Sequence, residues 1–310
     1  MEASSMTTQK IIPHLWFDNE AEEAARFYTS LFDYSDLGTI TRYGKEGYDI
    51  HGQPEGNILT VEFTLAGQQF IALNGGPHFH FTPAISFYVT CETEEEVDNL
   101  WQRLSEGGTV MMPLDQYDWS KKYGWTADKY GLTWQISLGN LNDVHEQKIV
   151  PSLMFVSEKG VAEEAIRHYT SLFKDSSITG ILRYGEGEDQ PQGTVQHAQF
   201  RLYGREVFMA MDTAPKYADF TFNEAVSLLI TCETQQEIDH LWEGLSAVPD
   251  AEQCGWLKDK FGVSWQVTPA ILNNLLQDPE SRKTERVTKA YLQMKKFDIA
   301  ALQQAYDGVL

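Results

Sequence analysis

Apolar and polar residues alternate along several short stretches of the chain. Between Leu59 and Leu65, every second side chain is apolar and the side chains between them are polar. A period of two residues is typical of a strand with one face in the core and one polar face. Ile11 to Phe17 and Ala84 to Cys91 are also strand-like, and residues 67–75 are predicted to close a hairpin with the 58–65 strand.

Two helices are predicted from a different spacing. Ala24, Phe27, Tyr28 and Leu31 recur at helical intervals, which predicts a helix over residues 20–32, with Asp18 or Asn19 as its cap. Residues 93–96, Thr-Glu-Glu-Glu, form a capping box that opens a second helix, which reaches residue 105.

Nearly all of these features occur twice in the chain. Residues 255–266, GWLKDKFGVSWQ, repeat residues 124–135, GWTADKYGLTWQ, with seven of twelve positions identical, and both predict a tight turn that leads into a strand. Each repeat contains the order strand, helix, three strands two times over. A doubly wound parallel sheet needs a helix after nearly every strand. The order of elements therefore predicts an α+β fold with two curved mixed sheets and the helices outside.

The repeats define the expected domains. Residues 1–146 form the first unit, residues 147–278 the second, and residues 279–310 a helical extension. Each unit, over about residues 10–138 and 148–268, is expected to pair its own two modules, and the two units are expected to pack as an internal pseudo-dimer. A fused pair buries the face that a lone unit exposes, so we expect a monomer. Residues 107–123 are expected to form a long loop, with Trp119 and Tyr123, that the second unit lacks.

Charge and composition restrict the partners. The chain has 310 residues and a net charge of -21, which makes nucleic acid and anionic membrane surfaces poor partners. No apolar run has the length of a membrane span, and the three cysteines and the polar N-terminus favour a cytoplasmic protein. Cys91 and Cys232 hold matching places and are expected to be buried. Residues 280–310 carry a charge of +2 and are expected to dock onto the acidic units.

Several segments resemble one family along most of the chain: IIPHLWF, EEAARFYTSLF, AISFYVTCETEEEVDNLW, GWLKDKFGVSWQ and MKKFDIAALQQAY. They are similar to the PhnB-like branch of the vicinal oxygen chelate superfamily, which includes glyoxalase I and the bleomycin-resistance proteins. Members of this branch often carry the name 3-demethylubiquinone-9 3-methyltransferase. The resemblance implies a site in the cup of a sheet, with residues from the first and last strands of paired modules around a divalent metal.

The resemblance assigns matching positions in each unit. In the first unit they are His14, Ser86 and Gln135, and in the second Ser152, Ser227 and Gln266. Serine hydroxyls and glutamine carbonyls are weak ligands for a divalent ion. A metal in the first unit would therefore use His14, Gln135 and Glu62, where Glu62 lies on the polar face of its strand.

Other histidines offer weaker candidates. His78 and His80 would lie on one face of an extended segment, which is a weak metal signal against a simple solvent-exposed loop. His197 and Arg201 could give the second unit an anion site of its own. Neither pair decides a function.

Three functions stay open at this stage. The first is binding of a small, partly aromatic ligand in the first cup, without chemistry; its ligand-binding candidates are His14, Trp16, Glu62, Ser86, Tyr88, Trp119 and Gln135, and those of the second unit are His197 and Gln266. The second is a metal-dependent lyase, isomerase or dioxygenase in which Glu62 and His14 are catalytic. The third is methyl transfer, which the sequence disfavours because it lacks a glycine-rich turn between a strand and a helix.

Overall fold

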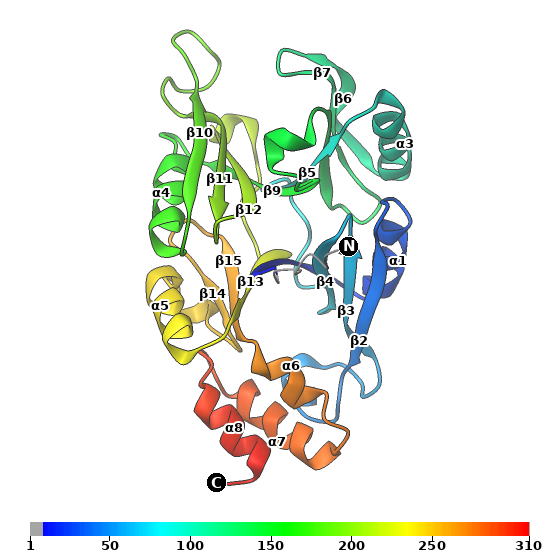
Figure 1. Ribbon diagram of the computed structural model, residues 1–310, viewed down its shortest axis with the longest axis vertical. Helices are drawn as coiled ribbons and strands as arrows, with labels where there is room; N and C mark the ends of the chain where they lie inside the picture. The colour runs from blue at the N-terminus through cyan, green and yellow to red at the C-terminus, as the bar shows by residue number, and fades with distance from the viewer. Residues whose placement is uncertain (1–8, 310) are drawn as a thin grey trace, which may run out of the picture.

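A computed structural model describes residues 9–309, which form two mixed β-sheets stacked one above the other (Figure 1). The α+β class predicted from the order of elements is confirmed. In spatial order the first sheet contains β14 (Trp256–Lys258), β15 (Ser264–Pro269), β13 (Val226–Cys232), β1 (Ile11–Phe17), β4 (Gln68–Asn74), β3 (Ile58–Leu65) and β2 (Asp36–Arg42). The second contains β10 (Ser177–Arg183), β11 (Val195–Leu202), β12 (Glu206–Thr213), β9 (Ile149–Val156), β5 (Ile85–Cys91), β8 (Thr133–Leu138), β7 (Ser120–Ala127) and β6 (Thr109–Tyr117).

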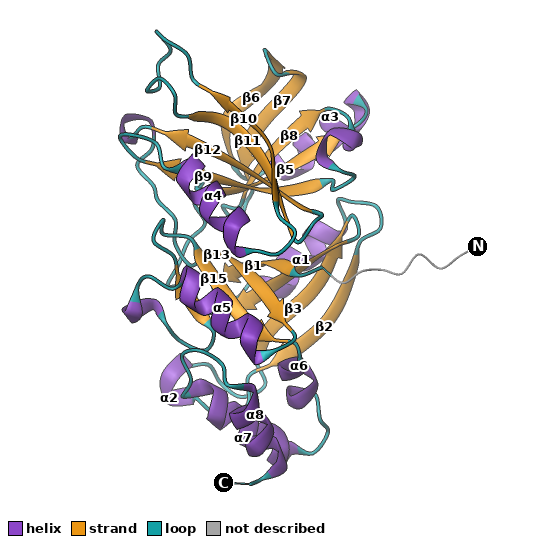
Figure 2. Ribbon diagram, turned by 60° about the vertical axis from the view of Figure 1, so that its left-hand side comes forward, coloured by secondary structure: helices purple, strands orange, loops and turns teal. Residues whose placement is uncertain are grey.

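Helices cover the outer face of each sheet. In Figure 2, α4 lies over the second sheet and α5 over the first. The four covering helices are α1 (Ala21–Thr29), α3 (Glu94–Ser105), α4 (Ala162–Leu172) and α5 (Gln235–Leu245). The remaining helices are α2 (Tyr48–His51), α6 (Ile271–Leu276), α7 (Ser281–Leu292) and α8 (Ile299–Asp307), with 3-10 turns η1 (Leu141–Val144), η2 (Pro215–Tyr217) and η3 (Pro249–Ala251).

Each sheet is shared between the two repeats. Strand β1 of the first repeat runs antiparallel to β13 of the second, and β5 runs antiparallel to β9. The first repeat lies on the right of Figure 1 and the second on the left, so both sheets cross the boundary between them. The expectation that each repeat forms its own sheet is therefore wrong. Within a repeat, β1 and β5 have open edges in different sheets, and the other repeat supplies the backbone groups that pair those edges.

The repeated twelve-residue motif joins the two modules of one repeat. The turn that it predicts is present, because the Gly131 N–H donates to the Asp128 carbonyl and Gly131 has φ +88°. The Asp128 side chain is buried and accepts hydrogen bonds from the Tyr28 hydroxyl (2.6 Å) on α1 and from Trp134 Nε1 (2.9 Å) on β8. Tyr169, Asp259 and Trp265 repeat this arrangement with the same distances. Since α1 covers the first sheet and β8 belongs to the second, the motif stabilises the fold.

The sequence predicted a helix cap correctly where the capping residue lies next to its helix, and missed it where the capping residue lies far along the chain. The Thr93 hydroxyl accepts from the Glu96 N–H at 3.2 Å, which confirms Thr93 as the cap, while the Glu96 carboxylate accepts from the Glu92 N–H at 3.1 Å, one residue before the position that the capping box predicts. The predicted cap of the first helix is wrong: neither Asp18 nor Asn19 caps it. The first helical N–H, that of Ala21, donates instead to Asn74 Oδ1 at 2.8 Å. Asn74 lies on β4, far along the chain, where no local pattern marks it as a cap.

The expected long loop of residues 107–123 is instead a β-hairpin. Strands β6 and β7 pair Val110 with Thr126 and Asp115 with Tyr123, with several shifts of register. Pro113 lies within β6, which is an edge strand, where a missing N–H breaks no ladder.

The C-terminal helices close one end of the first sheet, which confirms the predicted docking of the tail. The Cys254 and Gly255 N–H groups donate to the carbonyls of residues 294 and 295 at 2.8 Å. Three lysines of the C-terminal tail form ion pairs with acidic residues of the two repeats, as the positive charge of the tail suggested. The pairs are Lys289 with Glu46, Lys295 with Glu252 and Lys296 with Asp239. Among residues 9–309, no helix is both long and apolar enough to cross a bilayer.

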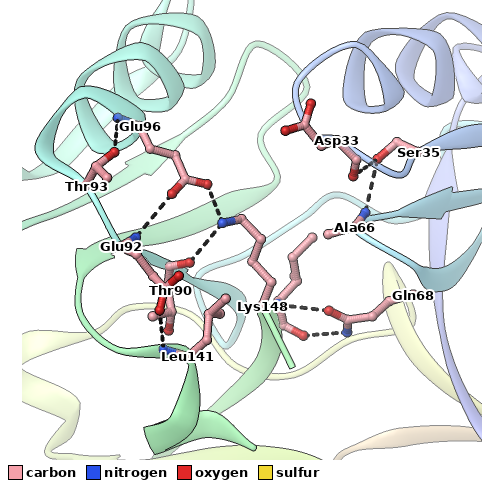
Figure 3. A network of polar contacts seen from close by, with 11 residues as sticks. Asp33, Ser35, Ala66, Gln68, Thr90, Glu92, Thr93, Glu96, Leu141 and Lys148 are labelled. Atoms are coloured by element: carbon pink, nitrogen blue, oxygen red, sulfur yellow. Dashed lines mark hydrogen bonds and ion pairs between the residues drawn. The ribbon is translucent and has the colours of Figure 1, made fainter. Parts of the chain in front are cut away.

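Two reciprocal clamps join the sheets at the boundary of the repeats. On one side, Gln68 Nε2 donates to the Ile149 carbonyl (2.6 Å), and Gln68 Oε1 accepts from the Ile149 N–H (2.9 Å; Figure 3). At the matching place, the Glu206 carboxylate accepts from the N–H groups of Lys10 and Ile11. Glu206 is 8% exposed, and burial raises its pKa from 4.5 to about 7 against the effect of these hydrogen bonds.

The raised pKa of Glu206 predicts a pH dependence of stability. Because the unfolded state loses the proton first, the free energy of unfolding should fall as pH rises from about 4.5 to about 7, by roughly 3 kcal/mol at most. Glu206→Gln should flatten this slope, and Gln68→Glu should steepen it. Urea unfolding between pH 5 and 7.5 measures both. Equal slopes for the wild type and Glu206→Gln would contradict the raised pKa.

Candidate functional site

The candidate site residues lie on the inner faces of the sheets, opposite the helices. On the first sheet, His14 of β1 pairs with Ser227 of β13 on one side and with Ile71 of β4 on the other. Ile71 in turn pairs with Glu62 of β3. His14 and Glu62 therefore share one row across the sheet, with their Cα atoms about 10 Å apart at the usual strand spacing.

His14 is buried beside two tryptophans. Its side chain is 5% exposed, and its ring centre lies 5.6 Å from that of Trp256 on β14. The ring centres of Trp16 and Trp256 lie 6.0 Å apart, and Nε1 of Trp16 donates to the Gly76 carbonyl. Burial lowers the pKa of His14 from 6.5 to about 4, so the imidazole is neutral at physiological pH.

Polar groups from the second repeat complete this face. Gln266 of β15 donates from Nε2 to the Ser227 hydroxyl at 3.0 Å. Ser264, two residues earlier on the same strand, is buried on the same face. Sequence reasoning placed Gln266 in a separate second cup and did not single out Trp256 or Ser264. The signal for Trp256 was present, since it matches Trp125 in the repeated motif.

The corresponding face of the second sheet holds a continuous hydrogen-bond chain. The Tyr123 hydroxyl donates to Gln135 Oε1 (2.6 Å), and Gln135 Nε2 donates to the Ser86 hydroxyl (2.7 Å). Ser152 pairs with Ser86 across the β5–β9 junction. Tyr88 lies next to Tyr123, with 6.3 Å between ring centres, and burial raises its pKa.

The linker between the repeats covers another part of this second face. Val144 packs against Val150, Val207 and Met209, and Leu141 packs beside Tyr88. The Gln199 side chain donates to the Asp143 carbonyl at 3.0 Å.

His197 and Arg201 of β11 also lie on the second face, and burial lowers the pKa of His197. Trp119 lies at its rim, 57% exposed and stacked on Tyr117 at 5.0 Å. Tyr88 and Trp119 therefore lie at the second sheet, whereas Trp16 lies on the first.

Buried polar atoms without partners mark both inner faces. Among residues 9–309, the buried side-chain polar atoms with no hydrogen-bond partner are His14 Nδ1, Ser264 Oγ, Trp125 Nε1 and Arg201 Nε. Strand pairing places the first two on the inner face of the first sheet and the other two on that of the second. Buried polar groups are almost always paired in folded proteins, with other protein groups, ordered water or a ligand, so these faces hold polar atoms that need a partner from outside the chain.

Comparison with known proteins identifies the family. The profile of a family described as 3-demethylubiquinone-9 3-methyltransferase matches residues 9–137 and again residues 147–268. The chain belongs to this family. Each repeat is one copy of the family unit, and the tandem arrangement predicted from the repeats is thereby confirmed.

Individual proteins are similar to parts of the chain or to its fold. A solved structure of a putative 3-demethylubiquinone-9 3-methyltransferase, PhnB protein, from Bacillus cereus is 47% identical over 42% of this chain and 100% of that chain, with a TM-score of 0.39. An uncharacterised Mycobacterium bovis protein is 32% identical over 40% of this chain and 79% of its own length. Glyoxalase I from Zea mays is 9% identical, covers 82% of this chain and 92% of its own and has a TM-score of 0.51; it shares the vicinal oxygen chelate fold.

The metal that this fold family implies does not fit the residues present. The predicted set of His14, Glu62 and Gln135 is not brought together, because Gln135 lies on the second sheet. Within residues 9–309, no three His, Cys, Asp or Glu side chains are grouped as metal ligands. Gln135 Oε1, the atom that would bind an ion, already accepts the Tyr123 hydroxyl.

The other histidines and cysteines considered from the sequence provide no further metal ligands. His78 and His80 are exposed, in a segment that forms no strand. Cys91 and Cys232 are buried, as expected, and burial raises the pKa of the Cys91 thiol to about 12, which keeps it protonated.

Proposed function

We propose that this protein binds a small, planar organic molecule on the inner face of the first sheet, at His14, Trp16, Trp256 and Gln266. The observation that carries this proposal is His14, a buried imidazole that makes no hydrogen bond with residues 9–309 and whose Nδ1 is fully covered. Two tryptophan rings beside it offer flat apolar surface. A ligand with one polar group would pair the imidazole and contact both rings.

The lowered pKa of His14 favours binding over proton transfer. A general base acts best when its pKa lies near the working pH. With a pKa of about 4, His14 is a poor base at pH 7 but a good neutral hydrogen-bonding group, able to donate from one nitrogen and accept at the other. Binding should therefore vary little between pH 5.5 and 8.

The residues at the matching positions of the second sheet are less suited to binding a ligand, which favours the first sheet as the binding site. At the place of His14 it has Ser152, and at the place of Glu62 it has Gln199, whose amide is engaged by the linker. The Tyr123, Gln135 and Ser86 side chains satisfy one another. The first sheet is therefore the better candidate, with His197 and Arg201 as the rival site on the second.

His14→Ser, which introduces the residue of the matching position, tests the proposal. We expect it to weaken binding of the neutral probes 2-naphthol and 1,4-naphthoquinone about tenfold, the value of one net hydrogen bond. The melting temperature should fall only slightly, because His14 has no hydrogen bond to lose and the change removes only its ring packing beside Trp256. Calorimetric titration measures the affinity, with His197→Gln as the matched control. A larger loss for His197→Gln would place the working site on the second sheet.

A further inference from the structure

The inner face of the first sheet carries a carboxylate that has no partner among residues 9–309. Glu62 of β3 is half-buried and makes no hydrogen bond or ion pair with that part of the chain. Strand pairing places it in the row of His14, with Ile71 between them. Taking a carboxylate partly out of water costs free energy unless a cation or a hydrogen-bond donor pairs with it. Glu62 is therefore a group that a ligand of this face can satisfy.

A ligand can reach Glu62 because the inner face of its strand is not fully covered. The side chains of Thr60 and Glu62 on this face are partly exposed, whereas Val61 and Phe63 on the helix side are fully buried. Ile71, the neighbour of Glu62 on β4, is partly exposed as well. The helix side of these strands thus has no room for a ligand, and the inner face has accessible surface beside the carboxylate.

The strands of the first sheet contain two lysine or arginine residues, and neither pairs with Glu62. Lys258 of β14 lies at the opposite edge of the sheet and pairs with Glu224 at 2.8 Å. Arg42 of β2 lies opposite the start of β3, about 13 Å from Glu62 at the usual rise per residue, and donates to the Gly56 carbonyl. Both cations are therefore engaged away from the Glu62 carboxylate.

Acidic residues outnumber cations at this edge of the sheet. Asp36 of β2 lies opposite Thr64, two residues along β3 from Glu62. The loop of residues 43–57, which follows β2, contains one lysine and three acidic residues. The charge around Glu62 is therefore negative, and it favours a cation over an anion or a neutral molecule.

The matching strand of the second repeat has the opposite charge. Gln199 of β11 holds the place of Glu62, and its amide donates to the linker between the repeats. Arg201 holds the place of Thr64. The two strands pair with β4 and β12 in the same register, so the fold itself does not need a carboxylate at this position. The charge of Glu62 is a property of the first sheet alone.

We propose that the ligand of the first sheet is an aromatic molecule that also carries an ammonium group, which donates to the Glu62 carboxylate. This inference rests on the ligand site proposed above and adds the charge of the ligand. A polar group at the other end of the molecule pairs with His14, and the ring lies against Trp16 and Trp256, both partly exposed. Tryptophan faces attract cations, and the net charge of -21 draws cations towards the protein.

Three phenols that differ in the charge of the side chain test this proposal: tyramine, 4-propylphenol and 3-(4-hydroxyphenyl)propanoate. In calorimetric titration of the full-length chain, the cation tyramine should bind about tenfold more tightly than neutral 4-propylphenol, and the anionic propanoate should bind most weakly. Glu62→Gln, which introduces the residue of the second repeat, should remove the preference for tyramine and leave the affinity for 4-propylphenol within about twofold of wild type. The control Glu186→Gln makes the same change of net charge at an exposed glutamate of the β10–β11 loop and should leave all three affinities within about twofold.

The outcomes separate this inference from the site on which it rests. Equal affinities of the wild type for tyramine and 4-propylphenol, or equal losses of tyramine binding in Glu62→Gln and Glu186→Gln, would overturn the ammonium assignment. If 4-propylphenol still bound and His14→Ser still weakened its binding, the site on the first sheet would stand with a neutral ligand. Failure of all three phenols to bind the wild type would overturn the site, and the ammonium assignment with it.

Discussion

Asp128→Asn is expected to lower the free energy of unfolding by about 3 kcal/mol. The buried carboxylate accepts four hydrogen bonds, two at Oδ2 from Tyr28 and Trp134 and two at Oδ1 from the N–H groups of Tyr130 and Leu132. An amide has one acceptor oxygen, so its NH₂ group must face two donors. The Tyr28 hydroxyl can turn and accept, but the Trp134 N–H and the backbone N–H groups cannot.

The second copy of the motif provides an internal test of this result. Asp259→Asn should have the same effect, because Asp259 accepts the same four kinds of hydrogen bond from Tyr169, Trp265 and two backbone N–H groups. Tyr28→Phe, which removes one donor and leaves the carboxylate, should cost only about 1 kcal/mol. Urea unfolding followed by circular dichroism measures all three. An Asp128→Asn variant as stable as the wild type would show that the motif does not fasten the modules together.

Local signals in the sequence predicted the elements well. The alternation from Leu59 to Leu65, the helix cap at Thr93 and the turn before Gly131 all depend on residues a few positions apart. Features that depend on distant residues were missed, such as the cap that Asn74 provides for α1. The β6–β7 hairpin was missed because Pro113 and the irregular register hide its alternation.

The site was predicted only in part, because the sequence does not reveal which strands meet. His14, Trp16 and Glu62 were correctly expected on one sheet, since they belong to one module. Gln135 and Gln266 end the two copies of the repeated motif, and Ser86 and Ser227 hold matching places, so either set could have joined His14. The open edges of β5 and β13 offer the same backbone groups to a partner. In the folded chain β13, rather than β5, lies beside β1.

Sharing of the sheets leads to a strong expectation for the two halves of the chain. Residues 1–146 and 147–310, produced separately and mixed, should form a one-to-one complex with the mass of the intact chain. Neither sheet is complete in one half, because the β1–β13 and β5–β9 ladders both cross the boundary. Each half alone should therefore self-associate or unfold at a much lower temperature, since its open edge strands pair with whatever is present.

The clamps at the boundary make this expectation specific. Gln68 of the first half holds Ile149 of the second through two hydrogen bonds, so Gln68→Ala should weaken association of the halves about tenfold. Gln69→Ala is the matched control, because the Gln69 side chain is exposed and makes no hydrogen bond within residues 9–309. Light scattering with size exclusion gives the masses, and titration of one half into the other gives the affinity. Halves that stayed monomeric and unfolded cooperatively at the temperature of the intact chain would contradict the shared sheets, because a half can be that stable only if it closes both of its sheets by itself.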